Sequence, residues 1–224
     1  MDVVLTLRDI ALLRLVAAFR VVPLDLLAER FFTTELNEDM ERAPSAVCRR
    51  RLRRLAQARY VQLGVEHDGR AHRTVARPGA RAACVVGGEP ARRRIPARNR
   101  VHHIRTLEAI RAVEREVHAR GGNVIEARLE HQLRGLEQRG RRVRPGDKLP
   151  SCPDAVVVAD LTFGGKLTRV EIAVEYVTSK YTDANIVAKH ESFARFHDVF
   201  WFADRPHTAE RVRRLTGASC AVLP

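Results

Sequence analysis

The sequence has few cysteines, few aromatic residues and no long apolar run, and these shortages exclude several classes of protein. Its four cysteines include no CxxC pair, which favours reduced thiols over a disulfide framework or a zinc site. No window approaches the roughly 18 uncharged apolar residues of a membrane span, and Asp2, Arg8 and Asp9 argue against a signal peptide. We therefore expect a cytoplasmic protein with no membrane partner.

Several nucleotide-binding and catalytic motifs are also absent from the sequence. It contains neither the GxxxxGK[ST] loop of ATPases nor the GxGxxG turn of dinucleotide-binding enzymes. It also lacks the GxSxG elbow of the acyl-transferring hydrolases. We therefore expect no nucleotide and no organic cofactor.

Positive charge is plentiful. The 224 residues carry 40 Lys and Arg against 27 Asp and Glu, a formal charge of +13, with an isoelectric point near 10.8. Such a balance favours a polyanionic partner, and double-stranded DNA is the first candidate. Since 36 of the 40 basic residues are Arg, GC-rich coding sequence explains part of the excess. An accessory protein whose basic surface reflects only its genome therefore stays open.

A segment rich in Gly, Pro and Arg predicts a division into two domains. Residues 87–98 read Gly-Gly-Glu-Pro-Ala-Arg-Arg-Arg-Ile-Pro-Ala-Arg and show no apolar period, which is typical of a linker. The predicted domains are residues 1–86 and 99–224.

The first domain is predicted to contain three helices followed by a β-hairpin. Thr6 and Asp9 form a capping-box pattern before the first helix, Pro23 suits the first turn of the second, and Ser45 is expected to cap the third. Alternating residues 60–63 and 73–76 predict strands around the turn pair Asp68-Gly69. This order is that of a winged helix-turn-helix domain, whose third helix enters the major groove of DNA.

The third helix is dense in arginine. Val47, Leu52 and Leu55 recur at helical spacing and are expected to face inward. Because Arg pairs bidentately with phosphate and with guanine, the helix and the following hairpin are the candidate DNA-binding surface. The candidate residues are Arg49, Arg50, Arg51, Arg53, Arg54, Arg70 and Arg73. A solvated basic face is the alternative interpretation.

The second domain is predicted to be an α/β domain with a mixed sheet. Its helices are expected at residues 101–119, 129–137, 183–196 and 209–215, with a basic loop at 139–150. Its strands are expected at residues 124–127, 154–159, 169–177, 199–202 and 218–223, with a hairpin turn at 163–166.

Acidic residues on two neighbouring strands of this sheet predict a metal site. Asp154 opens one strand and Glu175 lies on the next, so the hairpin can bring both carboxylates to one divalent cation. Carboxylates are the ligands that Mg²⁺ prefers, and Mg²⁺ can activate water for attack on a phosphodiester. Glu130 is a candidate outer ligand, and Lys180 or Lys189 could orient the water.

These residues resemble the PD-(D/E)xK nuclease superfamily, in which Pro-Asp opens one strand and a second acid lies on the next strand. When the Arg-Arg-Leu-Arg-Arg-Leu stretch at 50–55 and the pair His102-His103 are considered as well, the whole chain resembles the replication-relaxation family. The matching positions in the second domain are Glu130, Pro153, Asp154, Glu175, Lys189 and Phe193. The resemblance implies a winged helix followed by a restriction-endonuclease-like domain (an α+β and α/β chain) from a bacterial plasmid or mobile element, associated with replication.

One position departs from the superfamily pattern. The motif lysine would stand at position 177, on the same face as Glu175, and the chain has Val177 there. Either Lys180 or Lys189 would have to replace it. Two functions stay open: a Mg²⁺-dependent nuclease that nicks or cleaves duplex DNA, and a non-enzymatic transcription or replication regulator with a silent nuclease fold. A homodimer also stays open.

Overall fold

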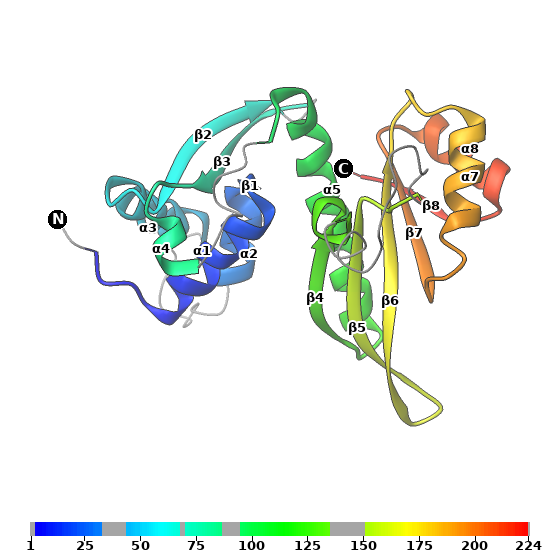
Figure 1. The fold of residues 1–224 in the computed structure, drawn as a ribbon, viewed down its shortest axis with the longest axis horizontal. Coiled ribbons are helices and arrows are strands. Elements are labelled where there is room, and N and C mark those ends of the chain that lie inside the picture. The colour runs from blue at the N-terminus through cyan, green and yellow to red at the C-terminus, as the bar shows by residue number, and fades with distance from the viewer. Residues whose placement is uncertain (1–2, 33–43, 68–69, 87–94, 135–150, 224) are drawn as a thin grey trace, which may run out of the picture. The chain divides into compact units, whose positions relative to one another are not determined.

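The computed structural model describes residues 3–32, 44–67, 70–86, 95–134 and 151–223. They form two compact units, Met1–Ile104 and Arg105–Pro224, and each unit has its own β-sheet (Figure 1). The chain is therefore a mixed α and β protein, as the sequence predicts. Among the described residues no helix has the length and apolarity that a membrane span requires.

Three helices begin the first unit: α1 (Leu7–Phe19), α2 (Leu24–Phe32) and α3 (Pro44–Gln57). The predicted capping box is present at the start of α1. The Thr6 hydroxyl accepts the Asp9 backbone N–H at 3.2 Å, and the Asp9 carboxylate accepts the Thr6 backbone N–H at 2.7 Å. Two of the backbone donors that a helix start leaves unpaired are thereby satisfied.

The sheet of the first unit is antiparallel with the order β1-β3-β2. Its strands are β1 (Val22–Pro23), β2 (Val61–His67) and β3 (His72–Pro78), and β2 pairs with β3 as the predicted hairpin. The turn pair Asp68-Gly69 lies outside the described residues. The placement of Pro23 in a helical turn was wrong, since it pairs with Val75 at the sheet edge, where a residue without an N–H is tolerated.

Several predicted boundaries in the first unit shift. Helix α3 begins at Pro44, so Ser45 lies inside its first turn, and Cys48 is buried where Val47 was expected to be. A short helix, α4 (Ala82–Val86), was not predicted. Helix α5 (Ala97–Ala119) starts four residues before the predicted 101. The first eight residues of the predicted linker, 87–94, lie outside the described residues.

The division between the units falls inside α5, at 104/105, rather than at residues 87–98. Ile104 is fully buried and packs with Val21 and Val75 in the core of the first unit. A ring nitrogen of His103 bonds the Phe19 carbonyl oxygen. The beginning of α5 therefore belongs to the first unit, because its apolar side chain completes that core.

The second unit contains the predicted mixed sheet, with the order β4-β5-β6-β7-β8. Antiparallel pairs join β4 to β5 and β5 to β6, while β6–β7 and β7–β8 are parallel. The strands are β4 (Asn123–Leu129), β5 (Ala155–Phe163), β6 (Lys166–Val177), β7 (Asp198–Ala203) and β8 (Cys220–Val222). The parallel connections run through α7 (Asp183–Ser192) and α8 (Pro206–Thr216).

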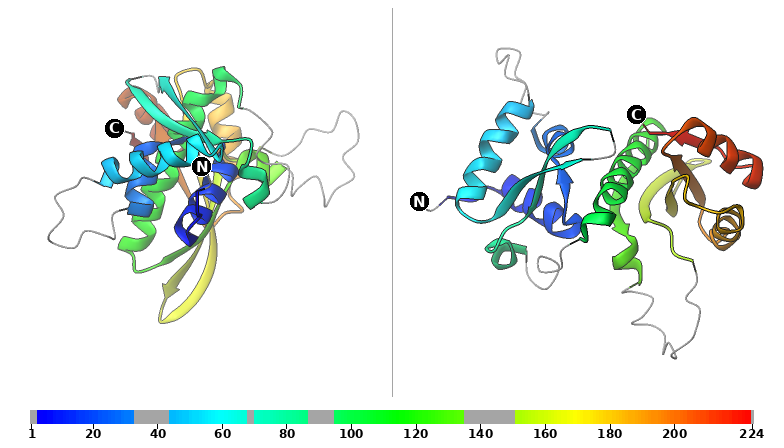
Figure 2. Two further views of the ribbon diagram at one scale, coloured as in Figure 1. Left: turned by 90° about the vertical axis from the view of Figure 1, so that its left-hand side faces the viewer. Right: turned by 90° about the horizontal axis from the view of Figure 1, so that it is seen from above.

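Helices cover both faces of this sheet. The part of α5 in the second unit lies on one face, and α7 and α8 lie on the other (Figure 2). Residues 155–159 are all buried, which explains the unbroken run of apolar residues in β5. On the α7 and α8 face the core contains Val177, Ile186, Phe193, Trp201 and Val212.

Two helix predictions in the second unit differ from the structure at one end. Leu129 ends β4, so the helical residues that follow begin at Glu130 and are described to residue 134. Helix α7 ends at Ser192 with Phe193 as its C-cap, rather than at 196. The predicted basic loop at 139–150 lies outside the described residues.

Candidate functional site

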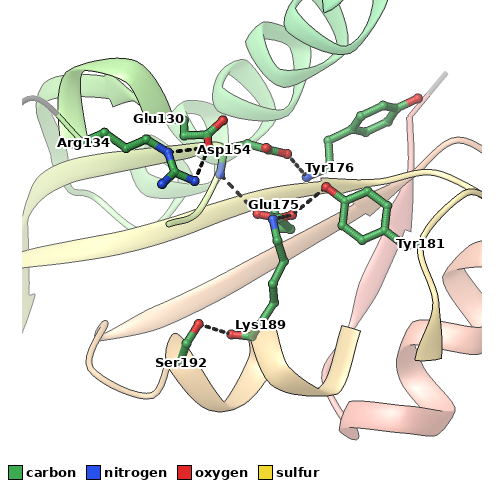
Figure 3. A network of polar contacts seen from close by, with 8 residues as sticks. All are labelled: Glu130, Arg134, Asp154, Glu175, Tyr176, Tyr181, Lys189 and Ser192. Carbon is green, nitrogen blue, oxygen red and sulfur yellow. Dashed lines mark hydrogen bonds and ion pairs between the residues drawn. The ribbon is translucent and has the colours of Figure 1, made fainter. Parts of the chain in front are cut away.

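Asp154 and Glu175 meet where the β5–β6 hairpin begins and ends. Ala155 pairs with Val174, so the preceding Asp154 lies opposite Glu175. The Asp154 backbone N–H donates to Glu175 Oε2 at 3.1 Å, and the Tyr176 backbone N–H donates to Asp154 Oδ2 at 2.9 Å (Figure 3). Each carboxylate is thus held by the backbone of the other strand, and both are buried.

Lys189 and Tyr181 complete the arrangement around Glu175. The Lys189 ammonium donates to Glu175 Oε1, and the Tyr181 hydroxyl donates to the same oxygen at 3.2 Å. Lys189 Nζ also lies 5.3 Å from the ring centre of Tyr181 and 6.0 Å from that of Phe193. We call Asp154, Glu175, Tyr181 and Lys189 the acid–lysine cluster.

The charges of the cluster are strongly perturbed. Burial, reinforced by repulsion from Asp154, raises the pKa of the Glu175 carboxyl to about 8, although Lys189 opposes the rise. Burial by itself lowers the pKa of the Lys189 ammonium, but the negative charges of Glu175 and Asp154 outweigh it and leave that pKa raised. Burial and the neighbouring carboxylates also raise the pKa of the Tyr181 phenol. Negative charge is therefore crowded here, which favours a cation.

Glu130 lies at the border of the cluster. Its backbone N–H donates to the Asp154 carbonyl oxygen at 2.8 Å, and its carboxylate pairs with Arg134 at 2.7 Å (Figure 3). The Glu130 charge helps to raise the pKa of Lys189, so the carboxylate is within electrostatic reach of the cluster.

The structure brings Lys189, and not Lys180, to the acids. Lys180 is exposed in the turn after β6, whereas Lys189 donates to Glu175. Val177 is fully buried against Ile186 and Trp201, so the position of the motif lysine is a core position in this chain. Helix α7, which covers the face of the sheet that carries Glu175 and Val177, supplies the ammonium of Lys189 instead. Glu171, earlier on β6, is exposed and lies 3.6 Å from Arg128.

The donor set fits a hard divalent cation. Asp154 and Glu175 supply carboxylate oxygens, and Mg²⁺ in proteins is typically held by one or two carboxylates with waters completing its shell. Glu175 Oε2 accepts the Asp154 backbone N–H, and a carboxylate oxygen has two acceptor sites. Across the described ranges, no three His, Cys, Asp or Glu side chains come together as ligands of one ion. A metal here would depend on the two strand carboxylates.

In the first unit, four arginines of α3 point outward. Arg49, Arg50, Arg53 and Arg54 are exposed, whereas Leu52 is buried. In the part of the chain that the structure describes, none of the four is held by an ion pair or a side-chain hydrogen bond. Because their side chains are exposed, all four guanidinium groups can reach a polyanion.

Arg51 differs from its neighbours on α3, because it is held within the first unit. Its Nε donates to Asp9 Oδ1 at 2.8 Å, and its Nη2 donates to the Val4 carbonyl at 2.9 Å. Burial alone would raise the pKa of the Asp9 carboxyl, but hydrogen bonds from Arg51 and Thr6 outweigh it and lower that pKa. Arg51 thus ties α3 to the start of α1.

The hairpin arginines are also partly engaged. Arg73 forms an ion pair with Asp25 of α2, which holds the hairpin against the helices. Arg70 is exposed beside the turn of the hairpin.

Comparison with known proteins gave no match among family models, curated proteins or solved structures. The resemblance to the replication-relaxation family therefore stays a prediction from the residues.

Sequence reasoning missed Tyr181. The available signal was Thr182, whose side chain caps α7 by accepting the Asn185 backbone N–H at 3.2 Å. A helix that begins at this point turns the chain back toward β6, and Tyr181, the residue before the cap, then lies close to Glu175. The contact itself depends on how α7 packs against the sheet.

Proposed function

We propose that the protein binds duplex DNA through its first unit and cleaves phosphodiester bonds with Mg²⁺ at the acid–lysine cluster. In this proposal the first unit acts as a winged helix and the second as a PD-(D/E)xK-like nuclease domain. The observation that carries the proposal is the contact of Lys189 with Glu175, beside Asp154. It supplies from α7 the ammonium that Val177 cannot provide.

Asp154 and Glu175 would hold the metal ion. A bound Mg²⁺ would lower the pKa of a water molecule and neutralise charge that develops on the phosphate. The protein side chains have separate tasks. The backbone N–H of Asp154 and the Tyr181 hydroxyl fix the Glu175 carboxylate in place, and Asp154 is fixed by Tyr176.

Lys189 would act on the phosphate. The pKa of its ammonium is raised by the neighbouring carboxylates, so it stays protonated at neutral pH. The Lys189 side chain is 20% exposed to solvent, and its protonated ammonium can donate a hydrogen bond to a phosphate oxygen as negative charge builds there. The rings of Tyr181 and Phe193 limit its movement.

The first unit would supply affinity for the duplex. The four exposed arginines of α3 and the +13 charge of the chain both favour the phosphate backbone. The proposed setting, a bacterial plasmid or mobile element and its replication, rests on the family resemblance alone.

The test is a nicking assay on supercoiled plasmid with Mg²⁺ or Mn²⁺. Lys189→Gln should lower the nicking rate by at least a hundredfold, since oxyanion-stabilising donors typically contribute that much. Lys180→Gln is the matched control, because it removes an exposed lysine outside the cluster, and it should keep the wild-type rate. Duplex affinity should be unchanged in both variants. Equal rates in the two variants would refute the assignment of Lys189.

A second candidate function, a DNA-binding regulator without catalysis, is favoured by a different observation. Glu175 is 0% exposed and its two oxygens accept bonds from Asp154, Tyr181 and Lys189. Such an internal ion pair can serve the fold alone. Calorimetric titration with Mn²⁺ separates the candidates: the nuclease binds the ion, and the regulator does not bind it even at millimolar concentration.

A further inference from the structure

The side chains of α3 divide into three groups around the helix axis. Cys48, Leu52 and Leu55 are fully buried, and Arg51 turns the same way toward Asp9. The opposite face repeats at intervals of four, three and four residues, as an α-helix requires. This outward face consists of Ala46, Arg50, Arg53 and Gln57, all exposed.

The two other exposed arginines stand on the flanks. With about 100° between successive residues, Arg49 projects about 70° to one side of the outward face and Arg54 about 70° to the other. Arg49 and Arg54 therefore lie about 140° apart, and each is about 40° from the nearer residue of the outward pair, Arg49 from Arg53 and Arg54 from Arg50.

A major groove about 12 Å wide receives a helix with its outward face toward the base edges and its flanks toward the two phosphate walls. From this we infer that Arg50 and Arg53 read guanine bases, while Arg49 and Arg54 bind the phosphates of the two strands. The inference rests on the proposed duplex binding. It assigns a specificity role to two residues and an affinity role to two others of identical chemistry.

The spacing along the helix limits where the guanines lie. Three residues of α-helix rise about 4.5 Å, and base pairs are stacked about 3.4 Å apart. Arg50 and Arg53 therefore reach guanines in adjacent base pairs or with one pair between them. Each guanine offers O6 and N7 as a bidentate acceptor pair for a guanidinium group.

The experiment selects binding sites for the full chain from a random duplex library and then compares two double variants. Arg50→Gln with Arg53→Gln should abolish the guanine preference and leave the salt dependence unchanged. Arg49→Gln with Arg54→Gln should keep the preference, weaken binding to every duplex and reduce the log–log salt slope by about 2. Replacing either guanine by 7-deazaguanine should weaken wild-type binding roughly tenfold to a hundredfold.

The outcomes distinguish this inference from the proposed function. If wild-type protein binds no duplex, duplex binding itself fails. If it binds duplex without selecting guanines, or if the flank variant loses the preference, the division of roles fails while duplex binding stands. A selected site with two close guanines that depends on Arg50 and Arg53 alone supports both.

Discussion

Substitution of Asp154 by Asn should change how the stability of the second unit depends on pH. In the metal-free protein, burial and then repulsion from Asp154 raise the pKa of Glu175 from 4.5 to about 8. Between these values the folded state holds a proton that the unfolded state has released. The free energy of unfolding must therefore fall as pH rises through this window, by up to about 1.4 kcal/mol per pH unit.

Asp154→Asn removes the repulsion and leaves the burial. The pKa of Glu175 should fall but stay above 4.5, so the window in which stability is lost becomes narrower. Above pH 8 the variant should be more stable than wild type by about 1.4 kcal/mol for each unit by which that pKa falls. The amide oxygen of Asn can still accept the Tyr176 N–H, so the backbone contact does not change the comparison.

Urea unfolding between pH 5 and 9, followed by tryptophan fluorescence, measures this effect. Trp201 is the sole tryptophan of the sequence and is 1% exposed in the second unit, so its signal reports on that unit. Glu171→Gln is the matched control, since Glu171 is an exposed acid of the same strand, and it should keep the wild-type slope. If Asp154→Asn lost as much stability in total between pH 5 and pH 9 as wild type does, the electrostatic account of the cluster would be refuted.

Three further predictions concern stability and binding. Arg51→Ala should lower the stability of the first unit by about 3 kcal/mol, because it leaves the 1% exposed Asp9 carboxylate without its partner. Arg49→Ala should stay within about 0.5 kcal/mol, and amide hydrogen exchange of the first unit compares the two; equal losses would contradict the bridge. Gly217→Ala should lower the stability of the second unit by about 1 kcal/mol by tryptophan fluorescence, since Gly217 ends α8 at φ 70°; an unchanged value would contradict this. Duplex binding should weaken with salt at a log–log slope of about −2, as the two phosphate contacts assigned to Arg49 and Arg54 predict, and a slope near zero in anisotropy titrations would exclude the α3 surface.

Much of the fold could be predicted because its signals are local. The capping box at Thr6, the apolar run of β5 and the turn at 163–166 each lie within a few residues of one another. Strand β1 and helix α4 were missed because two and five residues are too few to show a period. The pairing of Arg51 with Asp9 could not be predicted because the two residues lie 42 positions apart in the sequence, and only the fold of the first unit brings them together.

Part of the candidate site could also be predicted from the sequence. Phe163 pairs with Lys166, and counting back along both strands from that turn already places Asp154 opposite Glu175. The choice between Lys180 and Lys189 could not be made from the sequence, because it depends on which face of the sheet α7 covers. The contact of Tyr181 with Glu175 depends on the same packing.

A crystal structure of the protein grown with Mn²⁺ tests the central claim most directly. The anomalous signal of the ion should appear between the carboxylates of Asp154 and Glu175, with Lys189 beside it. A crystal that contains Mn²⁺ elsewhere or nowhere, with Glu175 still bonded to Lys189 and Tyr181, would contradict a metal-dependent phosphodiesterase.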